Sequence, residues 1–125
     1  MVIPKELKYT KDHEWLRVEG EFAVTGISDY AQEQLSDIVY VELPKVGKEV
    51  KRGQVLGTIE AVKAVVDLYA GLGGKVVEVN EKLTKSPDLV NKDPYGQGWM
   101  VKLKVEDLSE LEKLLSAEEY QNLIG

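Results

Sequence analysis

Apolar and polar residues alternate in two stretches near the amino terminus, Glu14–Val18 and Glu21–Ile27, which flank the pair Glu19-Gly20. Alternation with period two places the apolar side chains on one face of a strand. A glycine-containing pair between two such stretches is typical of a β-hairpin. The pattern therefore predicts that sheet structure begins with a hairpin over residues 14–27.

The pattern then changes to helical spacing and back. Ser28 or Asp29 can cap a short helix near residues 29–36, in which Ala31 and Leu35 share a face with Ile38. The β-branched run over residues 39–43 predicts a further strand, which Pro44 ends.

Lys63 lies in a stretch of otherwise apolar sequence, between strand-like residues 57–61 and 65–69. Burying its ammonium group would carry a large desolvation cost, so this side chain must reach water. A strand, a turn and a second strand satisfy that requirement, with Lys63 at the turn. From composition alone, an ordinary hairpin tip that happens to bear a lysine is the favoured interpretation.

The segments on either side of this hairpin are weakly similar in sequence to each other. Strand-like residues 46–50 and 55–60 with their turn resemble residues 73–80. Two small sheets packed face to face, with Lys63 at the apex of a hairpin, would accommodate both units.

The carboxyl-terminal part of the chain has a different pattern of residues. Residues 81–98 are rich in turn-forming residues and predict a long ordered loop with one helical turn, followed by a last strand over 99–105. Ser-x-x-Glu pairs at 109/112 and 116/119 have capping-box spacing. The apolar positions that follow them predict amphipathic helices over 107–125, packed on the sheets: Leu111, Leu114, Leu115, Tyr120, Leu123 and Ile124.

Length and composition narrow the class of protein. The 125 residues suit a single domain, 1–125, with 107–125 as a helical extension. The absence of cysteine excludes disulfides, thiolate metal sites and cysteine nucleophiles. Neither a membrane-spanning run nor the apolar core of a signal peptide is visible, which predicts a cytoplasmic protein with no membrane partner. The net charge of −6 argues against nucleic acid and favours partners with basic docking surfaces.

Catalytic patterns are poor. His13 is the only histidine, and its neighbours Asp12 and Glu14 do not by themselves form a triad or a metal site. The glycines at 71, 73 and 74 match neither a phosphate-binding loop nor a dinucleotide fingerprint, and Asp88 and Asp93 lack the ligand density of a calcium loop. We therefore expect a non-catalytic protein without a metal.

Four separated motifs nevertheless resemble the glycine cleavage H-protein family, in the same order and over about Leu7 to Tyr120. They are Tyr9–Trp15, Gly26–Gln32, Glu60–Ala64 and Asn91–Trp99. The lysine motif alone also resembles the broader lipoyl and biotinyl carrier domains. Biotinyl carriers usually have methionines beside the lysine, whereas Val62 and Ala64 flank Lys63 here, so lipoate is favoured.

The resemblance implies a flattened β-barrel or barrel-sandwich hybrid with lipoate joined through an amide to Lys63, and with Glu60, Val62 and Ala64 supporting the attachment motif. Ordinary covalent dimensions give the joined arm a reach of about 10–15 Å. In the family the arm takes an aminomethyl group from glycine decarboxylase (P protein) and gives it to an aminomethyltransferase (T protein). Dihydrolipoyl dehydrogenase (L protein) then reoxidises the arm. The implied partners are these three enzymes and the lipoylating enzymes.

A loaded arm ends in an ammonium group, which a water-excluding groove with carboxylates would protect. The resemblance makes Glu14 and Asp67 candidates for this arm-tip cleft, with Asp12 and Gln34 near the same positions. Each acid could equally be an ordinary solvated surface residue.

The chain also departs from the family pattern. Many members have serine where this chain has Ala61 and Val66, proline where it has Gly71, and histidine where it has Gln34. We expect the substitutions at positions 61, 66 and 71 to change the surface near the arm, where partners would dock, and the substitution at position 34 to change the arm-tip cleft. They leave open a related lipoyl carrier for another pathway, such as cytoplasmic sulfur oxidation or lipoate relay, and an interaction module with an unmodified lysine.

Overall fold

The computed structural model describes residues 1–125 and shows a mostly β fold with short helices. The strands are β1 (Lys8–Tyr9), β2 (Glu14–Glu19), β3 (Phe22–Ile27), β4 (Ile38–Glu42), β5 (Glu49–Val50), β6 (Val55–Ala61), β7 (Val65–Tyr69), β8 (Gly74–Val79) and β9 (Val101–Val105). The helices are α1 (Asp29–Leu35), α2 (Lys82–Lys85), α3 (Leu89–Lys92) and α4 (Ala117–Ile124), with a 3₁₀ helix at Leu108–Lys113.

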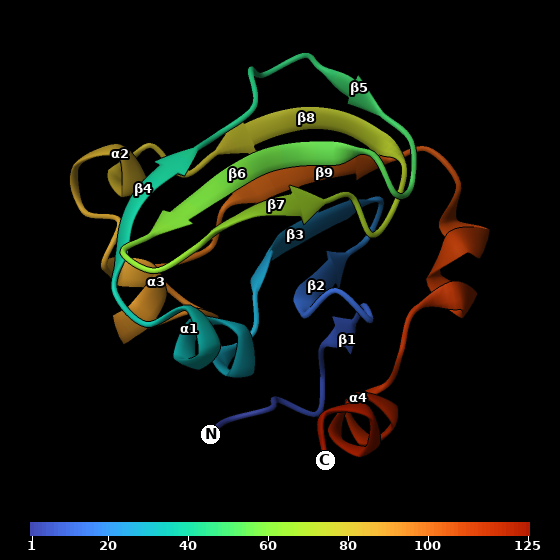
Figure 1. The fold of residues 1–125 in the computed structure, drawn as a ribbon. Helices are drawn as coiled ribbons and strands as arrows, with labels where there is room; N and C mark the ends of the chain where they lie inside the picture. Colours follow the sequence, from blue (N-terminus) through green and yellow to red (C-terminus); the bar gives the residue numbers. More distant parts are fainter.

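Two antiparallel sheets form the body of the molecule (Figure 1). The larger sheet has the order β1-β2-β3-β9-β8-β5, and the smaller sheet has the order β4-β6-β7. The expected pair of sheets is confirmed, but the sheets have six and three strands, and β5 pairs with β8 in the larger one. No strand of one sheet is paired with a strand of the other, so the fold is a sandwich without the closed ladder of a barrel.

The main core lies between the sheets. Ile59 and Leu68 enter it from the smaller sheet, and Val76 and Leu103 enter it from the larger one. All four are buried, and each contributes about 1.5–3 kcal/mol of transfer free energy. This layer joins the lysine-bearing hairpin to the rest of the molecule.

The hairpin expected over residues 14–27 is confirmed. Glu19 faces Phe22 across a two-residue turn, and Gly20 adopts a φ of 64° there. A positive φ at this position favours glycine, because a Cβ would be strained.

Residues 81–98 contain two short helices, α2 and α3, where the sequence predicted one helical turn. Leu83 in α2 and Val90 in α3 are both buried in the main core. The side chain of Asn91 accepts from the Ile38 N–H at 3.0 Å and donates to the Ser36 carbonyl at 2.7 Å. These bonds fix the segment against the end of α1 and the start of β4.

The carboxyl-terminal helices follow the prediction only in part. Ser116 and Glu119 form the expected capping box, with bonds of 3.1 and 2.9 Å. The first helix is a 3₁₀ helix capped by Asp107, whose side chain accepts from the Ser109 N–H, so the capping box expected at 109/112 was wrong. Asp107 accepts both from the Ser109 N–H, which Glu112 would accept in a capping box, and from the Ser109 hydroxyl, so the box does not form.

Helix α4 lies against β1 and buries Tyr120 completely, while Leu123 on the expected apolar face stays half exposed (Figure 1). Tyr120 joins a second apolar cluster with Tyr9 and Trp15 on the larger sheet.

Candidate functional site

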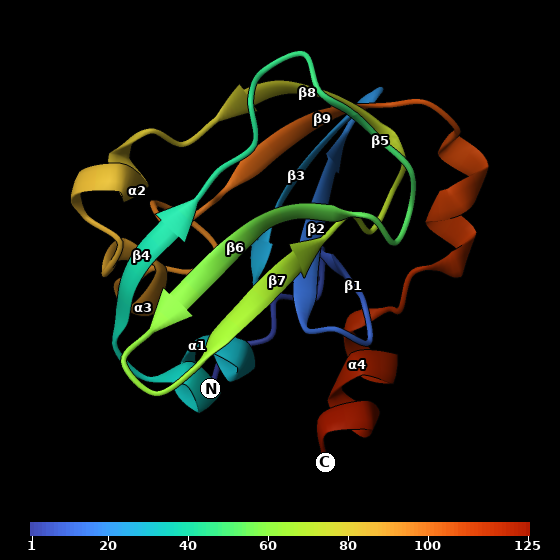
Figure 2. The ribbon, with the colours of Figure 1, turned by 45° about the horizontal axis from the view of Figure 1, so that its top comes forward.

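The loop 62–64 joins β6 to β7 at the end of the smaller sheet, where Figure 2 shows it projecting at the edge of the molecule. Glu60 pairs with Val65 across the hairpin, and the Ala61 N–H donates to the Ala64 carbonyl at 2.8 Å. Lys63 is exposed and has no carboxylate within ion-pair distance. The expected exposed lysine at a hairpin tip is therefore confirmed.

Apolar side chains surround this lysine. Val62 is 75% exposed and Val65 is 63% exposed, while Ala64 packs partly against the main core. Glu60 is also exposed. The tip thus presents a free amine between two uncovered valines.

A cavity of about 550 Å³ lies beside β7, between the 10–13 turn and helix α1; we call it the tip pocket. Asp12, Gln34 and Asp67 all line it, although they come from three different elements. The rest of its wall is mostly apolar and includes Ile27, Tyr30, Ala31, Leu35, Val65 and Val66, with Lys11, His13 and Tyr69 as further lining residues. The structure therefore brings together three of the four residues expected at an arm-tip cleft.

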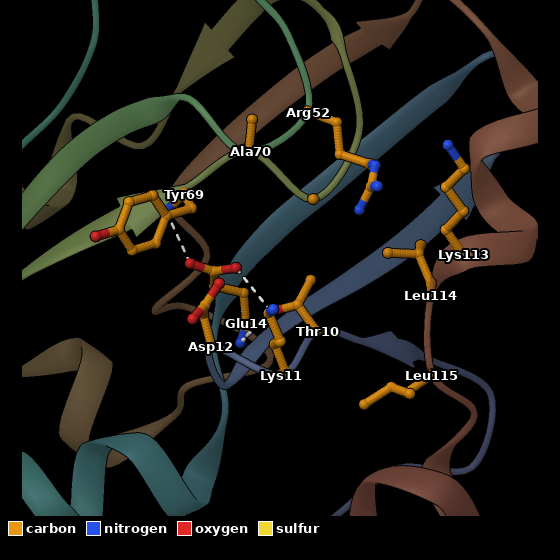
Figure 3. Close-up of a pocket in the computed structure, with 12 residues that line it drawn as sticks. Thr10, Lys11, Asp12, Glu14, Arg52, Tyr69, Ala70, Lys113, Leu114 and Leu115 are labelled. Atoms are coloured by element: carbon orange, nitrogen blue, oxygen red, sulfur yellow. Dashed lines mark hydrogen bonds between the residues drawn. The ribbon is translucent and has the colours of Figure 1, made fainter.

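Glu14 lies elsewhere. It lines a second cavity of about 500 Å³, the rear pocket, together with Arg52 and Lys113 (Figure 3). Its side chain is 1% exposed, so the reading of a solvated surface acid does not hold for this residue. One carboxylate oxygen accepts from the Thr10 hydroxyl at 2.7 Å and the other accepts from the Tyr69 N–H at 2.7 Å.

Burial raises the pKa of Glu14 to about 7, because desolvation outweighs the stabilising hydrogen bonds from Thr10 and Tyr69. Asp12 adds a smaller repulsion in the same direction. Glu14 thus fixes the backbone at the end of β7, the strand that lines both pockets, instead of facing the tip pocket.

The tip pocket begins close to Lys63. Its lining includes Val65, two residues along the chain from Lys63. Asp67 lies two residues further along β7, about 7 Å from Val65 at a rise of about 3.3 Å per residue. An arm with a reach of about 10–15 Å can therefore enter the tip pocket.

Sequence reasoning missed two tyrosines that line the tip pocket and the partners of His13. Tyr30 and Tyr69 line the tip pocket, and His13 lines it with its ring 5.0 Å from that of Tyr30. Tyr120 hydrogen-bonds to His13 from 107 residues away. No local pattern reports a contact of that separation, whereas the capping role of Ser28 was visible in the sequence and is confirmed.

The positions that depart from the family pattern are not all on the surface. Ala61 and Gly71 are buried, and a Cβ at position 71 would lie 2.9 Å from the side chain of Leu16. Of Ala61, Val66 and Gly71, only Val66 is exposed. The expectation that all three alter the docking surface was therefore wrong for Ala61 and Gly71, because their side-chain positions face the interior.

Two further properties concern metal ligands and membrane-spanning helices. No group of three or more histidine, cysteine, aspartate or glutamate side chains lies close enough to hold a metal ion. None of the helices has the length and apolar character needed to cross a membrane.

Comparisons with known proteins agree with this architecture. The family model for the glycine cleavage H-protein matches residues 7–125. The glycine cleavage system H protein of Carboxydothermus hydrogenoformans is 53% identical over 123 residues, which cover 98% of this chain and 95% of that protein. The crystal structure of a glycine cleavage system H protein from Mycobacterium marinum superposes with a TM-score of 0.90 at 38% identity, covering 98% of this chain and 99% of that one. The chain belongs to the glycine cleavage H-protein family.

Proposed function

We propose that this protein is a carrier that bears lipoate on Lys63 and rests the tip of the arm in the tip pocket. Membership of the H-protein family supports the role of a lipoyl carrier in glycine cleavage. In that role, lipoate supplies a dithiolane that accepts an aminomethyl group and reducing equivalents. The single observation that carries the assignment to Lys63 is an exposed, unpaired amine at a hairpin tip within arm's reach of a half-apolar cavity.

The residues of the tip pocket fit such an arm. Val65, Val66 and Leu35 offer an apolar wall to its hydrocarbon part. Asp12 and Asp67 offer carboxylates that an ammonium group at the tip can pair with. Gln34 adds an amide that can both accept and donate.

Glu14 supports the pocket indirectly in this proposal. Its hydrogen bond to the Tyr69 N–H holds the end of β7, and Tyr69 lines both cavities. We therefore assign contact with the arm tip to Asp12, Gln34 and Asp67, and a supporting role to Glu14.

The chemistry takes place on the partner enzymes, and the carrier itself is non-catalytic. The partners are glycine decarboxylase, the aminomethyltransferase, dihydrolipoyl dehydrogenase and the lipoylating enzymes. The cytoplasmic location, the absence of nucleic-acid and membrane partners, and the single domain 1–125 stay predictions from the sequence. The family match favours glycine cleavage over sulfur oxidation or lipoate relay.

Intact mass after incubation with a lipoylating enzyme tests the attachment site. The unaltered protein and Lys75→Arg, a control at an exposed lysine of β8, should gain one lipoyl group. Lys63→Arg should fold normally and gain none, because a guanidinium does not form the same amide. A lipoyl group on Lys63→Arg would overturn the assignment.

A second assay tests the pathway. The lipoylated protein is incubated with glycine decarboxylase and glycine labelled at the methylene carbon, and label on the arm is measured. Label should appear on the unaltered protein. Complete lipoylation without any transfer of label would exclude glycine cleavage while leaving the attachment site intact.

A further inference from the structure

The hydroxyl group of Tyr120 lies between two parts of the tip pocket, although Tyr120 itself belongs to the carboxyl-terminal helix. It is 2.7 Å from Ser28 Oγ and 3.0 Å from His13 Nδ1. The ring is completely buried and stacks on Tyr9, with centroids 4.7 Å apart and planes 3° from parallel. This packing fixes where the hydroxyl points.

The two partners of Tyr120 stand at the bases of two pocket walls. His13 ends the turn that carries Asp12, and its own ring lines the pocket. Ser28 is the N-cap of α1, the helix that carries Tyr30 and Gln34. One hydroxyl from α4 therefore joins the turn to the helix.

The hydrogen bonds form a continuous chain from helix α1 through Tyr120 to His13. Ser28 Oγ accepts from the Ala31 N–H at 3.2 Å, which leaves its own O–H free to donate to Tyr120. The Tyr120 O–H is then free to donate to His13 Nδ1. Burial lowers the pKa of His13, which keeps the ring neutral and able to accept this bond near pH 7.

The backbone of His13 needs such support. Its φ of 69° is in the left-handed region, which is uncommon for residues other than glycine. Besides the Tyr120 contact, its carbonyl accepts from the Ser28 N–H at 2.9 Å. The turn and the start of α1 are thus joined both directly and through Tyr120.

We infer that Tyr120 is a positioning residue of the tip pocket: its hydroxyl sets the relative placement of the 10–13 turn and helix α1. Helix α4 then does more than cover part of the larger sheet, since it also positions the walls of the pocket that receives the arm tip. The inference rests on the proposed function only for that last step, the residence of the arm tip in the pocket.

The first test uses the unlipoylated protein and needs no activity. Tyr120→Phe removes only the bridging hydroxyl, whereas Tyr9→Phe is a matched control that removes the hydroxyl of another fully buried tyrosine, bonded to the Pro4 carbonyl at 2.7 Å. Amide hydrogen exchange in α1 and NMR shifts of the 10–13 turn are compared. We expect exchange in α1 to be about fivefold faster in Tyr120→Phe, the effect of losing one typical hydrogen bond, and unchanged in Tyr9→Phe.

The second test uses lipoylated, loaded protein and measures the release of the aminomethyl group. Tyr120→Phe should release it several-fold faster than the unaltered protein, with lipoylation of Lys63 unchanged, and Tyr9→Phe should match the unaltered protein. Equal release and equal exchange in both variants, or equal acceleration in both, would overturn the positioning role. If the unaltered protein releases the group as fast as a short lipoyl-lysine peptide does, the proposed use of the pocket fails, and the exchange data still decide whether Tyr120 positions its walls.

Discussion

Asp67 and Glu14 show how two acids of one sequence come to have different properties. The side chain of Asp67 is exposed on β7 and has no hydrogen-bond partner. Glu14 is buried, and both of its carboxylate oxygens accept hydrogen bonds from the protein. The sequence marked both as candidates for the same cleft. Only the tertiary structure separates an acid that can meet a ligand from one that holds a strand.

Asp67→Asn keeps the size of the side chain and removes its charge. We expect normal lipoylation and about two- to fivefold faster release of a loaded aminomethyl group, since an exposed ion pair contributes little. The matched control is Glu42→Gln, an exposed acid aligned with Thr58 and Asp67 across the smaller sheet but outside the tip pocket. Unchanged release in Asp67→Asn, or equal acceleration in the control, would contradict a role for this carboxylate.

Glu14 predicts a pH dependence of stability. Its pKa is raised from 4.5 in the unfolded chain to about 7 in the folded protein, so the folded state binds more protons between these values. The free energy of unfolding therefore falls as pH rises from 4.5 to about 7, by about 2–3 kcal/mol from this group.

Glu14→Gln should remove this contribution, because its amide can accept from the Tyr69 N–H and donate to Thr10 without a charge. Urea unfolding at a series of pH values measures the difference between the two proteins. Glu21→Gln, at an exposed position, should keep the slope of the unaltered protein. A slope that survives in Glu14→Gln would show that other groups cause it.

At the scale of elements, the two carboxyl-terminal serines offer a matched pair. Ser116→Ala removes a capping box and should cost about 1 kcal/mol. Ser109→Ala removes only an exposed bond to Asp107 and should stay within about 0.5 kcal/mol of the unaltered protein. Urea unfolding measures both, and equal losses would contradict the different roles of these identical sequence spacings.

Those serines also show what the sequence could predict about elements. Local signals sufficed for the 14–27 hairpin, the Ser28 cap and the lysine-bearing turn, because each depends on residues within a few positions of one another. The capping box at 109/112 failed because Asp107, just outside the pattern, competes for the same donor. Propensity alone does not decide such a competition.

Contacts between distant segments lay beyond prediction. The two-residue strand β1 depends on its pairing with β2, and its sequence has no strand signal of useful length. The strand-like run 46–50 is reduced to the two residues of β5, which pair with β8, a partner that the local sequence does not reveal. Likewise, the tip pocket combines residues from the 10–13 turn, α1 and β7. The resemblance to a family supplied the candidate residues, and the fold decided which of them meet.

At the scale of the whole molecule, the net charge is −6, and three of the acids lie on the sheet that carries the Lys63 hairpin. The cross-strand register aligns Tyr40, Glu60 and Val65 in one row, and Glu42, Thr58 and Asp67 in the next. Residues in such rows share a face of a sheet. The outer face of the smaller sheet therefore presents three acids among exposed apolar groups, and Figure 2 shows no helix crossing it.

We expect a partner that acts on Lys63 to approach along this face, so its own surface should be basic. Attraction between exposed charges is screened over about 8–10 Å at physiological salt and weakens further above it. We expect the KM of a lipoylating enzyme for this protein to rise severalfold between about 50 and about 300 mM salt, with kcat nearly constant, because steering acts on encounter. Glu42→Lys should raise the KM at low salt and flatten its salt dependence, whereas Glu112→Lys, on the distant 3₁₀ helix, should behave as the unaltered protein. A KM that is independent of salt would exclude electrostatic steering, and equal effects of the two charge reversals would show that net charge and not this face governs the encounter.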